Sequence, residues 1–202
     1  IYYKYNIFFE KRKGLDFSSI ESIQTLSLDE KISEQYETTK IFELKRWLKK
    51  LPKGITYNAI DFGSGKGSVL ISLSNSNLFN NVLGVEISKK LTAISEKNVK
   101  LKKSSNVNVL TCNATDTPLE LISDSNFFFF YNPFPCDVFE KVFKKIELSL
   151  EKEKRQCVIM YFNPIYKNII DNSISFNEKI VCKNILSNAD TYIYFEGFDS
   201  DK

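Results

Sequence analysis

The sequence has 202 residues, of which 43% are hydrophobic and 26% charged, a composition typical of one globular domain with a sizeable core. The net charge is only +3 and the lysines are scattered along expected helices, so we expect no nucleic-acid partner. Histidine is absent, which excludes Ser-His and Cys-His nucleophiles and most metal sites, and the four cysteines lack a C-x-x-C spacing, which favours free thiols, no metal and a cytoplasmic location.

Residues 1–35 predict a helical extension that precedes a main domain of residues 36–202. Within residues 1–13, apolar side chains recur at helical spacing ahead of a basic cluster, and Gly14 is expected to end that helix. The favoured interpretation is a helix that packs on the domain or on a second copy of the chain. The alternative is a helix that binds a membrane surface or a partner. Residues 27–30, Ser-Leu-Asp-Glu, predict the cap of a second short helix.

Further along the chain, helical and strand patterns alternate, which is typical of a mostly parallel sheet with crossover helices on both faces. The expected strands are 58–62, 82–86, 107–111, 127–131, 157–161, 179–186 and 190–196, and the expected helices are 39–51, 66–75, one that Ser88 caps, and 137–150. The last two strands predict a C-terminal antiparallel hairpin, which completes an α/β fold of seven strands. In the helix after Ser88 we expect Leu91, Ile94 and Leu101 on the inner side. The longest apolar run, 127–131, is far shorter than the roughly 20 residues of a membrane span, so we expect no transmembrane segment.

A glycine-rich turn follows the first of these strands. Asp61 closes the strand, and glycines at 63, 65 and 67 leave no side chains where the backbone turns tightly, so a ligand can lie near the free N–H groups of the helix start. Glu86 ends the next strand, where an acidic side chain can accept both ribose hydroxyls of a nucleotide. The turn does not fit a P-loop, because Lys66 is followed by glycine, nor the dinucleotide pattern G-x-G-x-x-G, because Ser68 takes its last position.

The pattern D-x-G-x-G-x-G, with Glu86 after it, resembles motif I of the class I S-adenosylmethionine (SAM) methyltransferases. The resemblance implies a Rossmann-like fold, SAM as the cofactor and a methyl acceptor as the substrate. In that family the third strand often ends in Gly-Asp-Ala, with the acidic side chain on the adenine amino group. Asn113 stands at this position, and its side-chain carbonyl can accept the same hydrogen bond. The cofactor-binding residues implied so far are Asp61, Gly63, Ser64, Gly65, Gly67, Glu86, Ile87, Asn113, Ala114 and Asn132.

Upstream of this motif the sequence reads Tyr36-Glu37-Thr38-Thr39. It resembles a segment of the non-SET, class I histone lysine methyltransferase family, in which the tyrosine and the threonine reach over the methionine part of SAM. The resemblance assigns this contact to Tyr36 and Thr39. The alternative is a helix cap at Thr39 beside a packed tyrosine. From residue 36 onward, the motifs together also look like those of small bacterial class I methyltransferases of unassigned substrate.

The fourth strand runs into Asn132-Pro133-Phe134-Pro135, which resembles motif IV of amino-group methyltransferases. There the asparagine side-chain oxygen and the proline carbonyl accept protons from a substrate amine, and the aromatic ring walls the cavity and can contact a cationic head. The implied catalytic residues are Asn132, Pro133 and Phe134. The alternative is a proline-stiffened turn from a strand into a helix, and both interpretations can hold together.

The acceptor is less determined than the cofactor. An amide rather than a carboxylate at position 132, together with the absence of histidine, favours an amino group on a protein lysine or a small molecule, because a neutral amine needs no positioned base. Methylation of a hydroxyl on a small molecule or glycan is the alternative, with Asp116, Tyr161 or the neighbours of Glu86 as candidate bases. A third hypothesis is a protein that binds SAM or a nucleotide without catalysis. The oligomeric state is not predicted.

Overall fold

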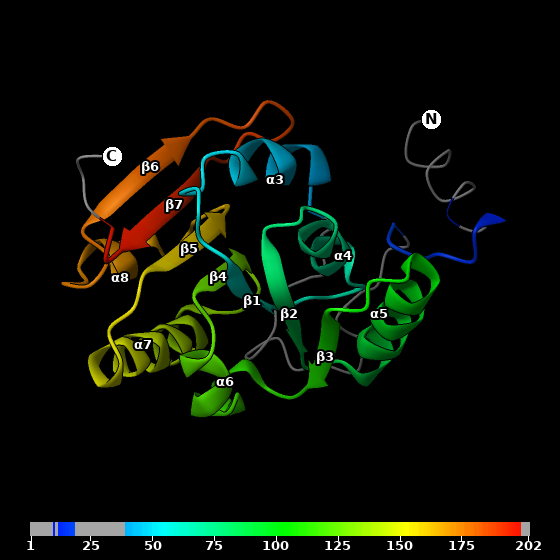
Figure 1. The fold of residues 1–202 in the computed structure, drawn as a ribbon, viewed down its shortest axis with the longest axis horizontal. Helices are drawn as coiled ribbons and strands as arrows, with labels where there is room; N and C mark the ends of the chain where they lie inside the picture. The colour runs from blue at the N-terminus through cyan, green and yellow to red at the C-terminus, as the bar shows by residue number, and fades with distance from the viewer. Residues whose placement is uncertain (1–9, 11, 19–38, 199–202) are drawn as a thin grey trace.

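A seven-stranded sheet organises residues 10, 12–18 and 39–198, the part of the chain that the computed structural model describes (Figure 1). The strands are β1 (Tyr57–Phe62), β2 (Phe79–Glu86), β3 (Val107–Thr111), β4 (Phe127–Tyr131), β5 (Cys157–Phe162), β6 (Glu178–Cys182) and β7 (Thr191–Glu196). Their order is β3-β2-β1-β4-β5-β7-β6; the first five are parallel, and β7 is antiparallel to both of its neighbours. This confirms the predicted α/β fold with a C-terminal antiparallel hairpin.

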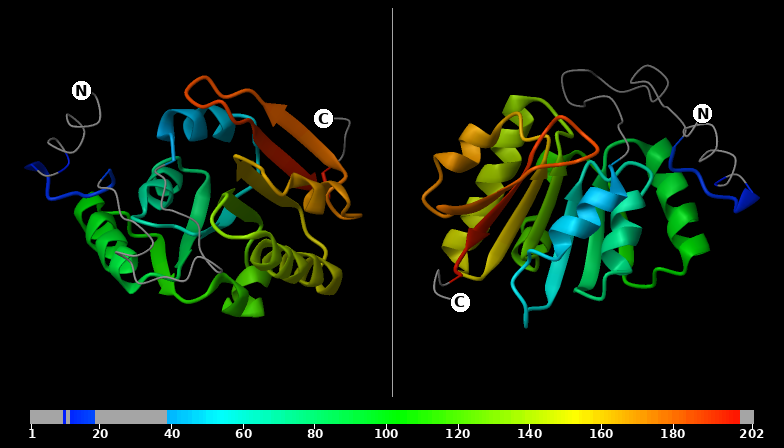
Figure 2. Two further views of the ribbon diagram at one scale, coloured as in Figure 1. Left: turned by 180° about the vertical axis from the view of Figure 1, so that it is seen from behind. Right: turned by 90° about the horizontal axis from the view of Figure 1, so that it is seen from above.

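Helices cover both faces of the sheet, as predicted (Figure 2). One face carries α3 (Ile41–Leu48), α4 (Ser68–Ser74) and α5 (Lys89–Lys102), and the other carries α6 (Leu119–Ser123), α7 (Cys136–Lys152) and α8 (Lys167–Asp171). A short 3₁₀ helix, η1 (Ala114–Asp116), follows β3. The three shortest of these elements, η1, α6 and α8, were not predicted, because segments of three to five residues are too short to show a helical periodicity.

The two hydrophobic cores explain the unusual sequence of β4. Phe127 and Phe129 belong to the core under α3 and α4, whereas Phe128 and Phe130 belong to the core under α7, and all four rings are almost completely buried. Side chains alternate between the faces of a strand, so a central strand that is covered on both faces needs apolar residues at every position. The run of aromatic residues therefore holds the middle of the sheet and ends at Tyr131, where the next residues leave the sheet.

Two strands differ from the prediction at their ends. β2 begins at Phe79, earlier than predicted, because Phe79 is buried and its ring centroid lies 5.7 Å from that of Tyr57 and 5.0 Å from that of Phe127. β6 ends at Cys182, so residues 183–190 form a loop that is longer than predicted. This loop returns the chain to β7 beside the end of β5, because Thr191 is paired with Phe162.

The inner side of α5 is more polar than expected, although Leu91 is buried as predicted. Ser88 caps the helix as predicted, by accepting a hydrogen bond from the Leu91 N–H at 3.3 Å. However, Leu101 is 47% exposed, and the buried side of the helix includes Ser95 and Asn98. A small residue is required at Ser95 because a Cβ atom on Gly67, at the start of α4, would lie only 2.3 Å from Ser95 Oγ.

Part of the predicted N-terminal extension lies against α5. Residues 10 and 12–18 include a helical turn that ends at Gly14, where φ is +70°, and Leu15 after it is buried. Asn98 of α5 donates through Nδ2 to the Asp16 carbonyl at 2.8 Å and accepts the Asp16 N–H through Oδ1 at 3.1 Å. The helices predicted within residues 1–13 and after residues 27–30 otherwise fall outside the described residues.

Candidate functional site

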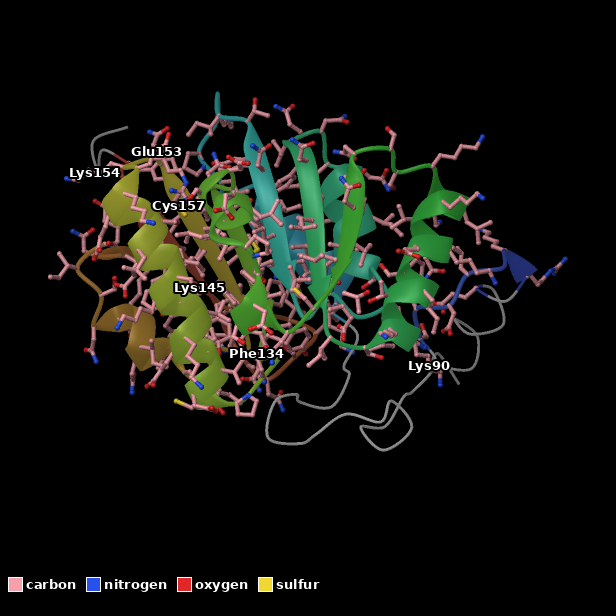
Figure 3. All side chains as sticks on the ribbon, turned by 90° about the horizontal axis from the view of Figure 1, so that it is seen from below. Lys90, Phe134, Lys145, Glu153, Lys154 and Cys157 are labelled. Carbon is pink, nitrogen blue, oxygen red and sulfur yellow. The ribbon has the colours of Figure 1, made fainter. Side chains whose placement is uncertain are left out.

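The predicted site residues gather at the carboxyl edge of the parallel strands. The strand ends are level there, because Phe62 is paired with both Val85 and Phe130, and Tyr131 is paired with Phe162. Figure 3 labels Phe134 and Lys90, which follow β4 and β2 in the chain, at this end of the molecule, and Cys157 at the opposite end. Ligands of open α/β sheets bind in the crevice outside the carboxyl ends of the strands, so this edge is the candidate functional site.

The backbone N–H groups of the glycine turn after β1 donate hydrogen bonds mainly to the end of β2. The N–H groups of Gly63 and Ser64 donate to the Val85 carbonyl at 2.8 and 3.1 Å, and the Gly67 N–H donates to the Ser64 carbonyl at 3.0 Å. The Gly65 N–H donates to Glu86 Oε2 at 2.9 Å. The N–H groups of the turn itself are therefore used within the protein, whereas the prediction of free N–H groups concerns the start of α4, which begins at Ser68, and stays a prediction. A ligand would meet a preformed turn rather than a set of vacant donors.

Each of the three glycines has a left-handed backbone, with φ values of +78°, +54° and +81° at Gly63, Gly65 and Gly67. Gly63 also brings the turn against the end of β4, because a Cβ atom there would lie 2.4 Å from the Cβ atom of Pro133. Gly67 allows α4 to approach Ser95 of α5, so this glycine has a packing role, and its contact with the cofactor stays a prediction. The glycines thus let the predicted cofactor turn pack closely against Pro133, a predicted catalytic residue, and against α5.

Glu86 lies at the end of β2 as predicted, and it is 6% exposed. Its Oε2 accepts the Gly65 N–H and its Oε1 accepts the Ser88 N–H, both at 2.9 Å. Burial raises the pKa of Glu86, while backbone N–H groups of Ser88, Gly65 and Ile87 act in the opposite direction. A carboxylate has about four lone-pair positions, so these bonds leave room for ribose hydroxyls, but they also give Glu86 a structural role that was not predicted.

Asp61 is buried at the end of β1, close enough to Glu86 for the two charges to interact. Burial raises its pKa well above the ordinary value, and the charge of Glu86 raises it further. Among the described residues, no basic side chain acts to lower the pKa of either carboxyl group. Two buried acidic groups without a basic partner make this part of the edge a site that suits a cationic ligand.

Asn113, the predicted adenine contact, caps η1. Its Oδ1 accepts hydrogen bonds from the Thr115 N–H at 3.1 Å and from Thr115 Oγ1 at 3.0 Å. These two bonds use the carbonyl oxygen that was predicted to accept the adenine amino group. Asn113 therefore acts as the N-cap of η1, and its contact with adenine stays a prediction. Ala114 follows as the buried first residue of η1.

The remaining predicted cofactor residues are only partly described. Thr39, which precedes the N-cap Lys40 of α3, is 7% exposed, whereas Tyr36 lies outside the described residues. Ser64 is also buried, and its Oγ makes no hydrogen bond to the described part of the chain. Ser64 Oγ would lie 2.6 Å from a Cβ atom on Gly84, so the serine fits against β2 only because residue 84 lacks a side chain.

Asn132 is the first residue beyond β4, and its φ of +43° is left-handed. Its Oδ1 is buried and accepts no hydrogen bond from the residues that the structure describes. An unpaired buried acceptor costs free energy, roughly 1–3 kcal/mol, and the left-handed backbone of a residue with a side chain adds to that. An acceptor oxygen held in this way beside the glycine turn is the feature that a proton-donating ligand would satisfy.

The ring of Phe134 does not line an open cavity. It is 4% exposed, and its centroid lies 6.2 Å from that of Phe130 and 6.3 Å from that of Phe139. The ring therefore fixes the turn between β4 and α7, which supports the alternative interpretation of Asn132-Pro133 as a stiffened turn alongside the predicted role. A contact between Phe134 and a cationic acceptor stays a prediction, and little of the ring surface is left to make it.

One feature of this edge was missed in the sequence. Lys66 is completely buried within the glycine turn, and its Nζ lies 3.1 Å from both carboxylate oxygens of Asp16. A lysine among glycines and apolar residues is the signal that could have prompted a search for a carboxylate partner. A second Asn-Pro pair follows β5, and Asn163 has a φ of +48°, so two asparagines with left-handed backbones end neighbouring strands.

No group of three or more potential metal ligands is clustered within the described residues. The four cysteines are free thiols, and two of them, Cys157 and Cys182, are buried. None of the helices in the described part of the chain has the length and apolar character needed to cross a bilayer.

Comparisons with known proteins agree with this geometry. Residues 56–145 match a family model described as "Putative methyltransferase". A "putative methyltransferase" from Streptococcus mutans in complex with SAH superposes with a TM-score of 0.59 at 13% identity, over 79% of this chain and 99% of that one. The chain has the fold of a SAM-dependent methyltransferase. A "SAM dependent methyltransferase" from Aquifex aeolicus gives a TM-score of 0.58 at 15% identity, over 80% of this chain and 98% of that one.

A "putative O-methyltransferase" from Nostoc punctiforme gives a TM-score of 0.61 at 11% identity and covers 76% of this chain, which spans 55% of the length of that structure. No curated protein matches the chain. The three structures share the methyltransferase fold at identities that carry no information on the acceptor. None of them is described as a histone lysine methyltransferase, so that resemblance of Tyr36 and Thr39 stays a prediction.

Proposed function

We propose that this protein is a SAM-dependent methyltransferase that transfers a methyl group to an amino group. The observation that carries the proposal is the buried, unpaired Oδ1 of Asn132, held beside the glycine turn at the carboxyl edge of β4. The methyltransferase fold and the family match over residues 56–145, which include β1 to β4, support the methyltransferase part of the proposal, and the choice of an amino group rests on Asn132.

The residues at this edge fit SAM, which is a cation at its sulfonium. Asp61 and Glu86 are buried without a basic partner among the described residues, and a positive charge nearby would favour their ionised forms. We assign the ribose to Glu86 and the methionine part to the turn that includes Gly63 and Gly65, with Thr39 and Tyr36 above it. The adenine would lie by Ala114, where Asn113 already caps η1.

Bound SAM supplies an electrophilic methyl group with a good leaving group, so the protein needs mainly to align the acceptor. Alignment of two reactants can supply roughly 7–11 kcal/mol of the barrier. Asn132 Oδ1 and the Pro133 carbonyl would accept the N–H groups of a neutral amine and direct its lone pair toward the cofactor. The close contact between Gly63 and Pro133 holds these acceptors in register with the cofactor turn.

Methylation of a hydroxyl is the second candidate, and the site supports it less. Tyr161, one of the predicted bases, is completely buried, and burial raises its pKa, so the prediction of Tyr161 as a base is wrong. Asp116 is exposed on η1 and accepts a hydrogen bond from Thr115 Oγ1 at 3.3 Å. The third hypothesis, SAM binding without catalysis, leaves the unpaired Asn132 oxygen without a purpose.

The test separates the three candidates without a known acceptor. Isothermal titration with SAM and with its demethylated product measures cofactor binding, and incubation of the protein with methyl-labelled SAM and a cell extract measures transfer. Label in protein or in amines supports the proposal, whereas label in hydroxyl groups supports the second candidate. Binding without transfer supports the third, and the absence of binding overturns all three.

A further inference from the structure

The candidate site is bordered by exposed apolar side chains. Among the described residues, five large apolar side chains are more than half exposed. Four of them, which we name the apolar rim, are Phe42 (56%), Ile165 (57%), Ile185 (69%) and Leu186 (54%). The fifth, Ile174, lies between α8 and β6, near the start of β6 and away from the candidate site. Exposed apolar residues that gather at one place mark an interaction surface, whereas scattered ones do not.

The apolar rim lies on three segments that are bonded to one another. The Glu43 carboxylate of α3 accepts the N–H groups of Ile185 and Leu186 at 2.6 and 2.9 Å, which fixes the 183–190 loop on α3 beside Phe42 (Figure 1). The Asn163 N–H, two residues before Ile165, donates to the Asp190 carbonyl of the same loop at 3.2 Å. Because Asn163 ends β5 next to Asn132, the rim borders the acceptor side of the site.

The same segments have a net positive charge. Residues 39–50, 163–167 and 183–190 hold seven basic and two acidic side chains, a net charge of +5, whereas the whole chain carries +3. Both acidic groups are used internally, since Glu43 is buried and Asp190 forms an ion pair of 2.7 Å with Lys183. Lys40 and Lys45 are exposed on either side of Phe42 in the sequence. The rim therefore combines protruding apolar side chains with a local positive charge.

We propose that the apolar rim docks on an anionic lipid bilayer and so turns the acceptor side of the site toward the membrane surface. Apolar side chains can enter the headgroup region while lysines remain at the anionic surface, and the two contributions together give stable association where one alone is marginal. Lysine is a point charge on a flexible stem, which suits a diffuse negative surface, whereas arginine suits fixed carboxylate or phosphate geometries. The one arginine of the three segments, Arg46, is engaged with Glu43 at 2.8 Å and stacks on Trp47.

The binding partner is a surface rather than a single molecule, so this inference goes beyond the proposed methyl transfer and does not depend on it. It also narrows the acceptor to one that is presented at the membrane surface. The alternative partner for such a surface is an acidic protein segment, which the experiment distinguishes.

The experiment is co-sedimentation of the cofactor-free protein with vesicles of phosphatidylcholine alone and with phosphatidylglycerol added. The test variants are Ile185→Ser with Leu186→Ser, which remove half of the apolar rim, and Lys40→Glu with Lys45→Glu, which reverse its charge. Matched controls are Ile174→Ser, which is 94% exposed away from the site, and Lys97→Glu with Lys100→Glu on the exposed side of α5. Circular dichroism and thermal unfolding verify that each variant is folded.

Wild type and both controls are expected to bind the anionic vesicles and not the neutral ones, with binding that weakens as salt is added. Each lysine near an anionic surface contributes about a fivefold factor in affinity, so the double charge reversal should lower binding at least tenfold. The apolar variant should also lose at least tenfold. Failure of wild type to bind anionic vesicles, as expected if the partner is an acidic protein segment, or equal losses in the controls would each overturn the proposal.

Discussion

Gly63→Ala tests the contact that joins the two halves of the candidate site. The new Cβ atom would lie 2.4 Å from the Cβ atom of Pro133, against 3.4–4 Å for an ordinary contact, so the two must separate by about 1 Å. Gly54 provides a matched control, because its φ of +79° is almost the same as the +78° of Gly63, but nothing lies within 4 Å of its Cβ position. Both variants place alanine in a left-handed backbone, at about 1 kcal/mol, and only Gly63→Ala also displaces Pro133.

We expect Gly63→Ala to lower the free energy of unfolding by roughly 1–3 kcal/mol more than Gly54→Ala, as overpacking does. Because Asn132 directly precedes Pro133, the shift should also misplace the acceptor oxygen, and a misplacement of about 1 Å can lower turnover on the order of 10²-fold. Urea unfolding measures the first effect, and transfer of label from SAM measures the second. If Gly63→Ala loses no more stability and no more activity than Gly54→Ala, the contact with Pro133 does not position the site.

Three further predictions concern the charged and polar groups around the site. Asp61→Asn should stabilise the cofactor-free protein at pH 7 by about 1–2 kcal/mol and weaken SAM binding. Because burial raises the pKa of Asp61, the stability of the wild type should fall as pH rises from the ordinary aspartate range through that raised value. Urea unfolding at several pH values should give a flatter profile for the variant. Asn132→Ala should lower turnover by about 10²-fold or more while the melting temperature stays nearly constant, because Oδ1 makes no hydrogen bond within the described residues; a large loss of stability would indicate a structural role instead. Asp16→Asn should destabilise the protein by about 1–3 kcal/mol in urea unfolding, because it removes the carboxylate that pairs with the buried Lys66. The double variant Asp16→Asn with Lys66→Met should recover part of that loss. Equal stability of Asp16→Asn and wild type would show that the ion pair does not stabilise the fold.

The sequence predicted the sheet and the edge at which the candidate site residues meet, because both depend on local patterns. Strands such as β4 are apolar at every position, and the glycine turn and Asn132-Pro133 directly follow strands, so parallel topology brings them to one edge. The roles of individual groups were harder to predict. A glycine at position 67 looks the same in the sequence whether it makes room for a ligand or, as the structure shows, for Ser95.

Hydrogen bonds that depend on loop conformation or on distant parts of the chain account for the rest of what was missed. That both Glu86 oxygens bind backbone N–H groups, and that Asn113 caps η1, follows from the conformation of neighbouring loops and not from residue type. The ion pair between Asp16 and Lys66 joins positions 50 residues apart, and a pairing at that separation leaves no periodic signal. The sequence therefore predicted the edge at which the candidate residues meet but not the contacts that hold it together.

The central claim, that SAM binds at this edge beside Asn132, is tested most directly by a crystal structure of the protein with the demethylated cofactor product. We expect the ribose hydroxyls within hydrogen-bond distance of Glu86 and the sulfur over the glycine turn. The former methyl position should face Asn132 Oδ1 across a gap that an acceptor nitrogen can fill, with reacting atoms roughly 3–3.5 Å apart. Product bound away from the ends of β1, β2 and β4, or oriented with its sulfur turned away from Asn132, would contradict the account.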